Sequence, residues 1–267
     1  MENNLIELKT KWQIPDYKIE YWLGRRRDFC VVIPVINEGD RIHSLLKRMQ
    51  SEYIANISDI IIIDGGSNDG SLENEILKKE DVNGLLIKTG AGKLSSQLRI
   101  AYSFAIEQGY IGVITIDGND KDNPKHIPAF ISALKIGVDF VQGSRFVPGG
   151  ISQNTPKSRV FAIRFVHAPI LSLASGFKWT DTTQGFRGYS RRLLIDERLS
   201  IFRDIFREYE LLAYINCRAP KLNFNCIELP TSRVYPNGHI PTKIKGIRGQ
   251  LRLLKVLFET CFKRYNP

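Results

Sequence analysis

Short apolar runs alternate with helical patterns along the first half of the chain. Runs rich in β-branched residues predict buried strands, and apolar residues spaced three and four apart predict helices that cover them. The predicted strands are residues 30–33, 60–63, 85–88, 113–116 and 139–142, and a helical pattern follows each of the first four. Strands that alternate with helices predict an α/β fold with a mostly parallel sheet and right-handed crossovers.

The alternation stops after the fifth strand. A long helical pattern covers residues 160–173, a polar turn follows at 180–187, and a further helix and strand are predicted at 205–217 and 222–229. We find no internal repeat and no low-complexity linker. The pattern therefore predicts an N-terminal extension (1–29), one catalytic domain (30–233), and a basic loop with an amphipathic helix (234–267).

The composition is that of an ordinary globular protein, with 43% hydrophobic and 25% charged residues. No stretch approaches the roughly 20 apolar residues that span a bilayer. The N-terminus, Met1-Glu-Asn-Asn, lacks the basic and apolar regions of a signal peptide. The four cysteines are scattered and have no metal-ligand spacing, so we expect reduced thiols in a cytoplasmic protein.

The net charge of +10 is concentrated at the C-terminus. Between Thr231 and Pro267 eight Lys and Arg residues stand against one acid, Glu259. This asymmetry indicates an anionic partner, either nucleic acid, a membrane surface or phosphates. Nucleic acid is the least favoured of these partners, because the basic residues form no recognised nucleic-acid-binding motif and acids at the strand ends would repel its phosphates.

Acids and amides gather where the predicted strands end. They are Asn37 and Glu38, Asp64 and Asp69, and the run from Asp117 to Asp122. Because the carboxyl ends of parallel strands share one edge, we expect these groups to lie together where ligands of α/β sheets bind. They suit a nucleoside, ribose hydroxyls or a hard cation. An Asp- and Gly-rich turn without chemistry is the alternative for the 117–122 run, and neither the dinucleotide nor the P-loop glycine signature is present.

Several motifs in order resemble the family-2 inverting glycosyltransferases. They are Pro34-x-x-Asn37-Glu38, Asp64-Gly-Gly-Ser67-x-Asp69, the acidic turn at Asp117, and Gly143-Ser-Arg145. Two later motifs are similar to the dolichyl- or polyprenyl-phosphate branch of that family. They are Asp181-x-Thr-x-Gly185-Phe-Arg187-x-Tyr189 and Arg233-x-Tyr-x-x-Gly238-x-x-x-Thr242-Lys243.

The resemblance implies a GT-A fold, a nucleotide-sugar donor and a set of site residues. The nucleoside pocket would be lined by Pro34, Val35, Asn37, Glu38, Asp64 and Ser67. The ribose and diphosphate would lie at Asp117, Gly118 and Asn119. The phosphates would be held by Arg145, Arg233 and Lys243, because Arg binds phosphate in a bidentate manner and Lys acts as a point charge.

The metal motif of the family is altered in this chain. The usual D-x-D reads Asp117-Gly-Asn119-Asp120-Lys121. The resemblance implies Mg²⁺ or Mn²⁺ at Asp117 and Asn119, although an amide brings no charge. Lys121 could instead replace part of the metal's role at the leaving diphosphate, and both alternatives stay open.

The acceptor decides whether a base is needed. The resemblance implies transfer to a polyprenyl phosphate, which is already ionised, with Asp117, Asp181 and Arg187 as catalytic residues. A sugar hydroxyl is the alternative acceptor and would need a carboxylate base such as Asp181, or less favourably Glu208 or Glu210. A third alternative is a module that binds nucleotide sugars without turnover.

The predicted C-terminal helix carries two stripes. Its apolar stripe is Ile244, Ile247, Leu251, Leu254, Phe258 and Cys261, and its basic stripe is Lys245, Arg248, Arg252 and Lys255. Such a helix can lie in an anionic membrane interface, which would place the protein peripherally at the inner face of the membrane. Packing of the apolar stripe on the domain, or on a second subunit of a homo-oligomer, is the alternative.

Overall fold

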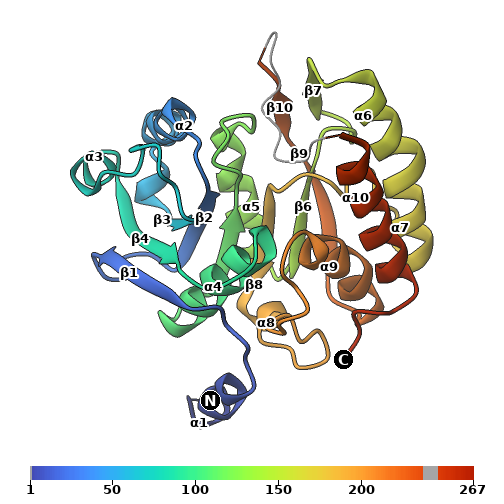
Figure 1. Ribbon diagram of the computed structural model, residues 1–267, viewed down its shortest axis with the longest axis horizontal. Coiled ribbons are helices and arrows are strands. Elements are labelled where there is room, and N and C mark those ends of the chain that lie inside the picture. The colour runs from blue at the N-terminus through green and yellow to red at the C-terminus, as the bar shows by residue number, and fades with distance from the viewer. Residues whose placement is uncertain (1, 237–245) are drawn as a thin grey trace.

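Eight strands form one sheet at the centre of the molecule (Figure 1). The computed structural model describes residues 2–236 and 246–267. In spatial order the strands are β1 (Tyr17–Trp22), β4 (Val82–Lys88), β3 (Asp59–Asp64), β2 (Phe29–Val35), β5 (Gly112–Thr115), β8 (Arg187–Ser190), β6 (Phe140–Ser144) and β9 (Cys226–Pro230). Strands β7 (Ile151–Gln153) and β10 (Ser232–Val234) pair in parallel as a separate small sheet.

Helices cover both faces of the sheet. The helices of the described chain are α1 (Glu2–Thr10), α2 (Asp40–Ser51), α3 (Asn74–Lys79), α4 (Leu94–Glu107), α5 (Ile127–Lys135), α6 (Lys157–Ala162), α7 (Ala168–Ser175), α8 (Arg191–Leu194), α9 (Glu210–Lys221) and α10 (Gly246–Cys261). Helix α1 lies apart from the sheet (Figure 1). A π-helical segment, Ile163–His167, joins α6 to α7, and short 3-10 turns lie at Ile54–Asn56 and Pro124–His126.

The apolar runs of the sequence are explained by burial on both faces. Every residue of β3 is buried. Alternate residues of β2 and β3 enter two cores, one under α2, α3 and α5 and the other under α4, α7 and α9. Strands buried on both sides read as continuous hydrophobic runs, which is why the parallel part of the sheet was predictable.

The order in which parallel strands are added to the sheet changes sides at β2. Strands β2, β3 and β4 are parallel and proceed to one side, whereas β5 pairs with the other side of β2. The loops that follow β2 and β5 therefore diverge from a topological switch point at the carboxyl edge, where open α/β sheets bind ligands.

The predicted α/β fold with a mostly parallel sheet is confirmed, and its five predicted strands correspond to β2 through β6, with ends that differ by a few residues at most. Four strands were not predicted: β7 and β10 of the small sheet, and two strands of the central sheet. Part of the N-terminal extension forms β1, which pairs antiparallel with β4, and the end of the polar turn forms β8, which lies antiparallel between β5 and β6. The strand predicted at 222–229 begins only at Cys226, because α9 continues to Lys221.

The predicted C-terminal helix is present as α10, and it packs on α7 and α9. Leu254 and Cys261 of the predicted apolar stripe are partly buried against the domain, whereas Leu251 and Phe258 of the stripe are exposed. Val256 and Leu257, outside the predicted stripe, are buried. The apolar stripe therefore packs on the domain in part. Lys243, predicted to hold a phosphate, lies outside the described residues. Within residues 2–236 and 246–267, the helices are too short or too polar to cross a bilayer.

Candidate active site

Asp117 follows β5 at the switch point and forms an ion pair with Arg233. The Asp117 Oδ2 atom lies 3.1 Å from Arg233 Nη2, and Arg233 Nη1 pairs closely with Asp122. Asp122 is fully buried and Arg233 is 7% exposed. Burial disfavours the charged guanidinium, but the carboxylates of Asp122 and Asp117 outweigh it and raise the pKa of Arg233. A permanently charged, fixed cation therefore stands beside Asp117.

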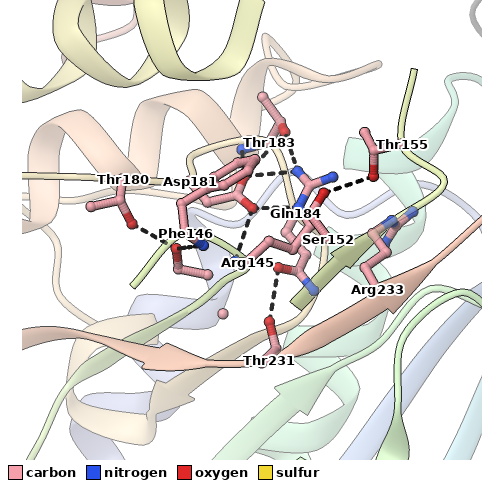
Figure 2. Close-up of polar contacts among 12 residues, drawn as sticks. Arg145, Phe146, Ser152, Thr155, Thr180, Asp181, Thr183, Gln184, Thr231 and Arg233 are labelled. Atoms are coloured by element: carbon pink, nitrogen blue, oxygen red, sulfur yellow. Dashed lines mark hydrogen bonds and ion pairs between the residues drawn. The ribbon is translucent and has the colours of Figure 1, made fainter. Parts of the chain in front are cut away.

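The loop of residues 181–187 packs against the cluster formed by Asp117, Asp122 and Arg233. A Cβ atom on Gly185 would lie 2.2 Å from Asp117 Oδ1, so only glycine lets the loop approach the carboxylate this closely. Gln184 donates from Nε2 to Asp122 Oδ1 (2.6 Å) and accepts from the Thr231 hydroxyl (3.0 Å; Figure 2). The motif thus positions both aspartates.

Asp181, predicted as a catalytic carboxylate, is held by Arg145 (Figure 2). Arg145 donates to it from Nε (2.6 Å) and Nη2 (3.0 Å), and the Thr183 hydroxyl lies 3.2 Å from its Oδ1. Asp181 has no exposed surface. The geometry therefore favours a positioning role for Asp181 rather than a base, and Arg145 keeps one buried nitrogen, Nη1, without a hydrogen-bond partner in the described chain.

Arg187, also predicted as catalytic, is fully buried. Its three nitrogens donate to the backbone carbonyl oxygens of Gln184 (3.0 Å), Thr182 (2.9 Å) and Leu212 (2.8 Å). This geometry favours a structural role, in which Arg187 fixes the loop under Asp117.

The weaker base candidates are also engaged. Glu208 forms ion pairs with Lys93 (3.1 Å) and Arg252 (2.8 Å). Glu210 accepts from the backbone nitrogens of Arg207 and Glu208 at the start of α9.

The loops after β2 and β3 interlock beside the switch point. Asp64 accepts from the Ser67 backbone nitrogen (2.8 Å) and hydroxyl (2.6 Å), and the Asn37 nitrogen donates to the same hydroxyl (3.0 Å). Glu38 pairs with Arg41 at 2.7 Å. These residues, which were predicted to bind the nucleoside, therefore form one rigid wall of the site at the carboxyl edge of the sheet.

Pro34 and Val35, also predicted to line the nucleoside pocket, pack against Gly118, the residue after Asp117. A Cβ atom on Gly118 would lie 2.9 Å from Val35 Cγ2 and 3.3 Å from the Pro34 carbonyl oxygen. A cleft of about 370 Å³ is lined by Asp64 and Ser67 of this wall together with Leu72, Leu85 and Ile87. The Asp117 cluster does not border that cleft.

The metal candidates form only a partial donor set. Asn119 donates from Nδ2 to Asp117 Oδ2 (3.4 Å) and accepts from the Lys121 backbone nitrogen (3.3 Å). Asp120 turns away to Ser44 and Arg48. No group of three or more His, Cys, Asp or Glu side chains suited to a metal occurs in the described ranges. With the amide turned so that its oxygen faces Asp117, one carboxylate and one amide oxygen would suit a cation whose remaining ligands come from substrate phosphates, as is usual for Mg²⁺.

The structure adds two residues that sequence reasoning did not assign. Tyr235 accepts a hydrogen bond from Arg159 Nη1 (2.9 Å), and Lys121 Nζ lies 5.0 Å from the centre of its ring. Burial raises the pKa of the Tyr235 phenol, but Arg233 and Arg159 outweigh it and lower the pKa. Tyr235 lies within the 233–243 motif and could have been noticed, whereas Arg159 lies in a helical pattern that carries no motif.

Comparison with known proteins places these residues in context. Residues 30–197 match the family described as Glycosyl transferase family 2. The chain is 25% identical over 203 residues to the polyprenol monophosphomannose synthase of Mycolicibacterium smegmatis, covering 75% of each chain. It is 25% identical over 206 residues to the undecaprenyl-phosphate mannosyltransferase of Micrococcus luteus, covering 76% of this chain and 82% of that protein.

A solved structure shares the fold. It is the glucosyl-3-phosphoglycerate synthase of Mycobacterium tuberculosis in complex with Mn²⁺, UDP and glucosyl-3-phosphoglycerate, with a TM-score of 0.63 and 15% identity over 90% of this chain and 81% of that chain. At this identity the likeness concerns the fold alone.

Proposed function

Because the chain belongs to glycosyltransferase family 2, we propose that it transfers a sugar from a nucleoside-diphosphate sugar to a polyprenyl phosphate, with inversion at the anomeric carbon. The names of the relatives from Mycolicibacterium smegmatis and Micrococcus luteus support a polyprenyl-phosphate acceptor. The observation that carries the proposal is the charge distribution around Asp117. Four cations lie there against three carboxylates that are already paired: Lys121, Arg145, Arg159 and Arg233 against Asp117, Asp122 and Asp181.

The donor binds across the switch point. The interlocked loops at Asn37 and Asp64 hold the nucleoside, with Pro34, Val35, Glu38 and Ser67, and Gly118 lets the loop after β5 pack closely against Val35 beside the ribose. The diphosphate then lies beside Asp117 and Arg233. As the bond to the sugar breaks, negative charge grows on the diphosphate, and the fixed guanidinium of Arg233 stabilises it without reorganisation.

Arg145 and Lys243 complete the phosphate contacts. Arg145 offers its unpartnered Nη1 atom to a phosphate oxygen, which would satisfy a buried donor that otherwise costs free energy. Lys243 is included because of its position in the 233–243 motif.

A divalent cation, Mg²⁺ or Mn²⁺, is proposed at Asp117 and Asn119, and when bound it supplies Lewis-acid stabilisation of the leaving diphosphate. The Mycobacterium tuberculosis complex, which contains Mn²⁺ together with UDP, supports the choice. Lys121 is the alternative source of positive charge. It is buried beside Asp117 and Arg233, and burial lowers its pKa.

The state of the carboxylates favours a phosphate acceptor over a hydroxyl. A hydroxyl must lose a proton to a base, whereas a phosphate arrives ionised. Asp181 is bound by Arg145, Glu208 by Lys93 and Arg252, and Asp122 by Arg233. A base with a free carboxylate is therefore not available from these candidates.

An apolar surface beside the site suits a membrane-embedded acceptor. It comprises Phe161, Phe165 and Leu173 of the α6–α7 segment with Leu251, Phe258 and Phe262 at α10, all exposed. Leu173 is 89% exposed, and Figure 1 places α6, α7 and α10 together on one side of the molecule. With the basic C-terminus, this surface would bind an anionic bilayer peripherally. The unpaired cysteines suit the cytoplasmic face.

A thermal-shift screen of UDP-, GDP-, dTDP- and CMP-sugars, with and without Mn²⁺, tests the donor. We expect one nucleotide class to raise the melting temperature, and Asp64→Asn to weaken that effect. A chain that none of these sugars stabilises would contradict a nucleotide-sugar site.

A further inference from the structure

Tyr235 connects three segments that border Asp117. It is 2% exposed and follows β10. Its backbone nitrogen donates to the Gln153 carbonyl (3.0 Å), and its own carbonyl accepts from Asn154 Nδ2 (3.2 Å). The preceding residue, Val234, donates to the Lys121 carbonyl (2.8 Å). The tyrosine is thus fixed between the β7–α6 segment and the loop that carries Asp117.

Three cations converge on this one side chain. Arg159 donates to the phenol oxygen at 2.9 Å, with its guanidinium carbon 5.6 Å from the ring centre. The Lys121 ammonium lies 5.0 Å, and the Arg233 guanidinium carbon 5.7 Å, from the same point. Cations within about 6 Å of an aromatic face are attracted by its negative quadrupole. The ring therefore holds together groups that would otherwise repel one another.

The charges around Tyr235 do not balance. Arg145 is neutralised by Asp181, and Arg233 is shared by Asp117 and Asp122. Arg159 forms no ion pair with the described residues, and its side chain is oriented by the Tyr235 hydroxyl. With Lys121, four cations thus stand against three carboxylates, Asp117, Asp122 and Asp181. A surplus of positive charge beside Asp117 is suited to a phosphate group.

We propose that Tyr235 is a positioning residue that gathers Arg159, Lys121 and Arg233 into one phosphate-binding group. Its hydroxyl acts on Arg159 through the hydrogen bond and also interacts with Arg233, and its ring acts on Lys121 and Arg233 through the aromatic face. The inference rests on the proposed function for the source of the phosphate, which is the donor diphosphate or the acceptor monophosphate.

Two variants separate the hydroxyl from the ring. Tyr235→Phe removes the bond to Arg159 and keeps the ring, whereas Tyr235→Leu removes both. Tyr214→Phe is the matched control, because its buried hydroxyl donates to the Leu199 carbonyl (2.7 Å) away from the site. Calorimetry with UDP and with farnesyl phosphate measures the affinity for each phosphate source, and thermal melting follows the fold.

Tyr235→Phe should weaken binding of at least one of the two ligands about tenfold, as expected for one hydrogen bond to a charged group. The Tyr214→Phe variant should bind both ligands like the wild type. In an Arg159→Gln background the effect of Tyr235→Phe should shrink, because the bond to Arg159 is already lost, while Tyr235→Leu should still weaken binding through Lys121 and Arg233.

The inference is overturned if Tyr235→Phe binds both ligands like the wild type, or if its effect persists unchanged without Arg159, since a purely structural role gives that result. The ligand whose affinity falls identifies the phosphate source. Binding is measured without turnover, so a chain that binds these ligands through Tyr235 but transfers no sugar would contradict the proposed function and leave this inference intact.

Discussion

At the scale of single residues, Asp117 is defined by what surrounds it. A carboxylate at a buried strand end is costly unless a cation or donor accompanies it. Here Arg233 supplies the cation, and the absence of a side chain at Gly185 supplies the space. The same arrangement leaves Asp117 partly exposed, with 23% of its side-chain surface accessible, so it can face a ligand.

Asp117→Asn should lower sugar transfer by about two to three orders of magnitude, the range found when one preorganised electrostatic group is removed. The protein should melt like the wild type because the side chain is not deeply buried. Steady-state transfer rates measure the effect. Asp120→Asn is the matched control, since Asp120 binds Ser44 and Arg48 away from the cluster, and near-normal transfer by a folded Asp117→Asn variant would contradict the site.

Gly185→Ala should reduce transfer on the order of a hundredfold, because the new methyl group meets Asp117 Oδ1 and displaces it from a geometry that tolerates little error. Gly188→Ala, whose Cβ atom would lie no closer than 3.3 Å to its neighbours, serves for comparison. Equal transfer rates for the two variants would show that Asp117 is not positioned by this contact.

The metal assignment predicts that EDTA abolishes transfer and that Mn²⁺ or Mg²⁺ restores it. Asn119→Asp should lower the half-saturating Mn²⁺ concentration by about tenfold, because metal affinity in oxygen sites follows ligand charge. If transfer survives EDTA, the positive charge comes from Lys121 instead, and Lys121→Gln should then create a dependence on Mn²⁺.

At the scale of elements, the sequence was most informative where one physical requirement dominates. The five strands β2 to β6 were predictable because burial on both faces demands apolar runs. The convergence of Asn37, Asp64 and Asp117 followed from parallel strands sharing an edge. The family predicted from these motifs is confirmed by the match over residues 30–197.

What could not be predicted depends on contacts between distant segments. Strand β8 is only four residues long, and it forms because β5 and β6 offer their edges on either side. Strand β1 alternates too weakly to be read as a strand, since its residues are partly or fully exposed at the edge of the sheet. The pairing of Asp181 with Arg145 joins residues 36 positions apart, which no local pattern reveals.

The α6–α7 segment and α10 give a prediction at this scale. Replacing Phe161 and Phe165 together by Ser should weaken binding to phosphatidylglycerol vesicles about tenfold or more, because each buried aromatic side chain contributes about 1.5–3 kcal/mol. Ile136→Ser, a similarly exposed residue after α5, is the control. Vesicle sedimentation at low and high salt measures the electrostatic and the apolar contributions to binding. Binding that neither salt nor the double substitution reduces would contradict a membrane surface here.

At the scale of the whole molecule, the site and the apolar surface belong to one arrangement. Arg159 of α6 reaches Tyr235 at the phosphate cluster, while Phe161 on the same helix is exposed. A lipid phosphate whose chain lies in the bilayer would meet the cations without leaving the membrane interface. The net charge of +10 would attract both the proposed anionic surface and the proposed nucleotide donor.

Product analysis with competing acceptors tests the central claim most directly. The protein is incubated with labelled nucleotide sugar and vesicles containing a polyprenyl phosphate, or with a soluble or lipid-linked sugar hydroxyl, and Asp117→Asn is run in parallel. We expect a polyprenyl-phosphate sugar of inverted anomeric configuration, formed by the wild type and lost in the variant, and Asp181→Asn should leave the shape of the pH–rate profile unchanged. Transfer only to the sugar hydroxyl, or no turnover of any nucleotide sugar, would contradict the account.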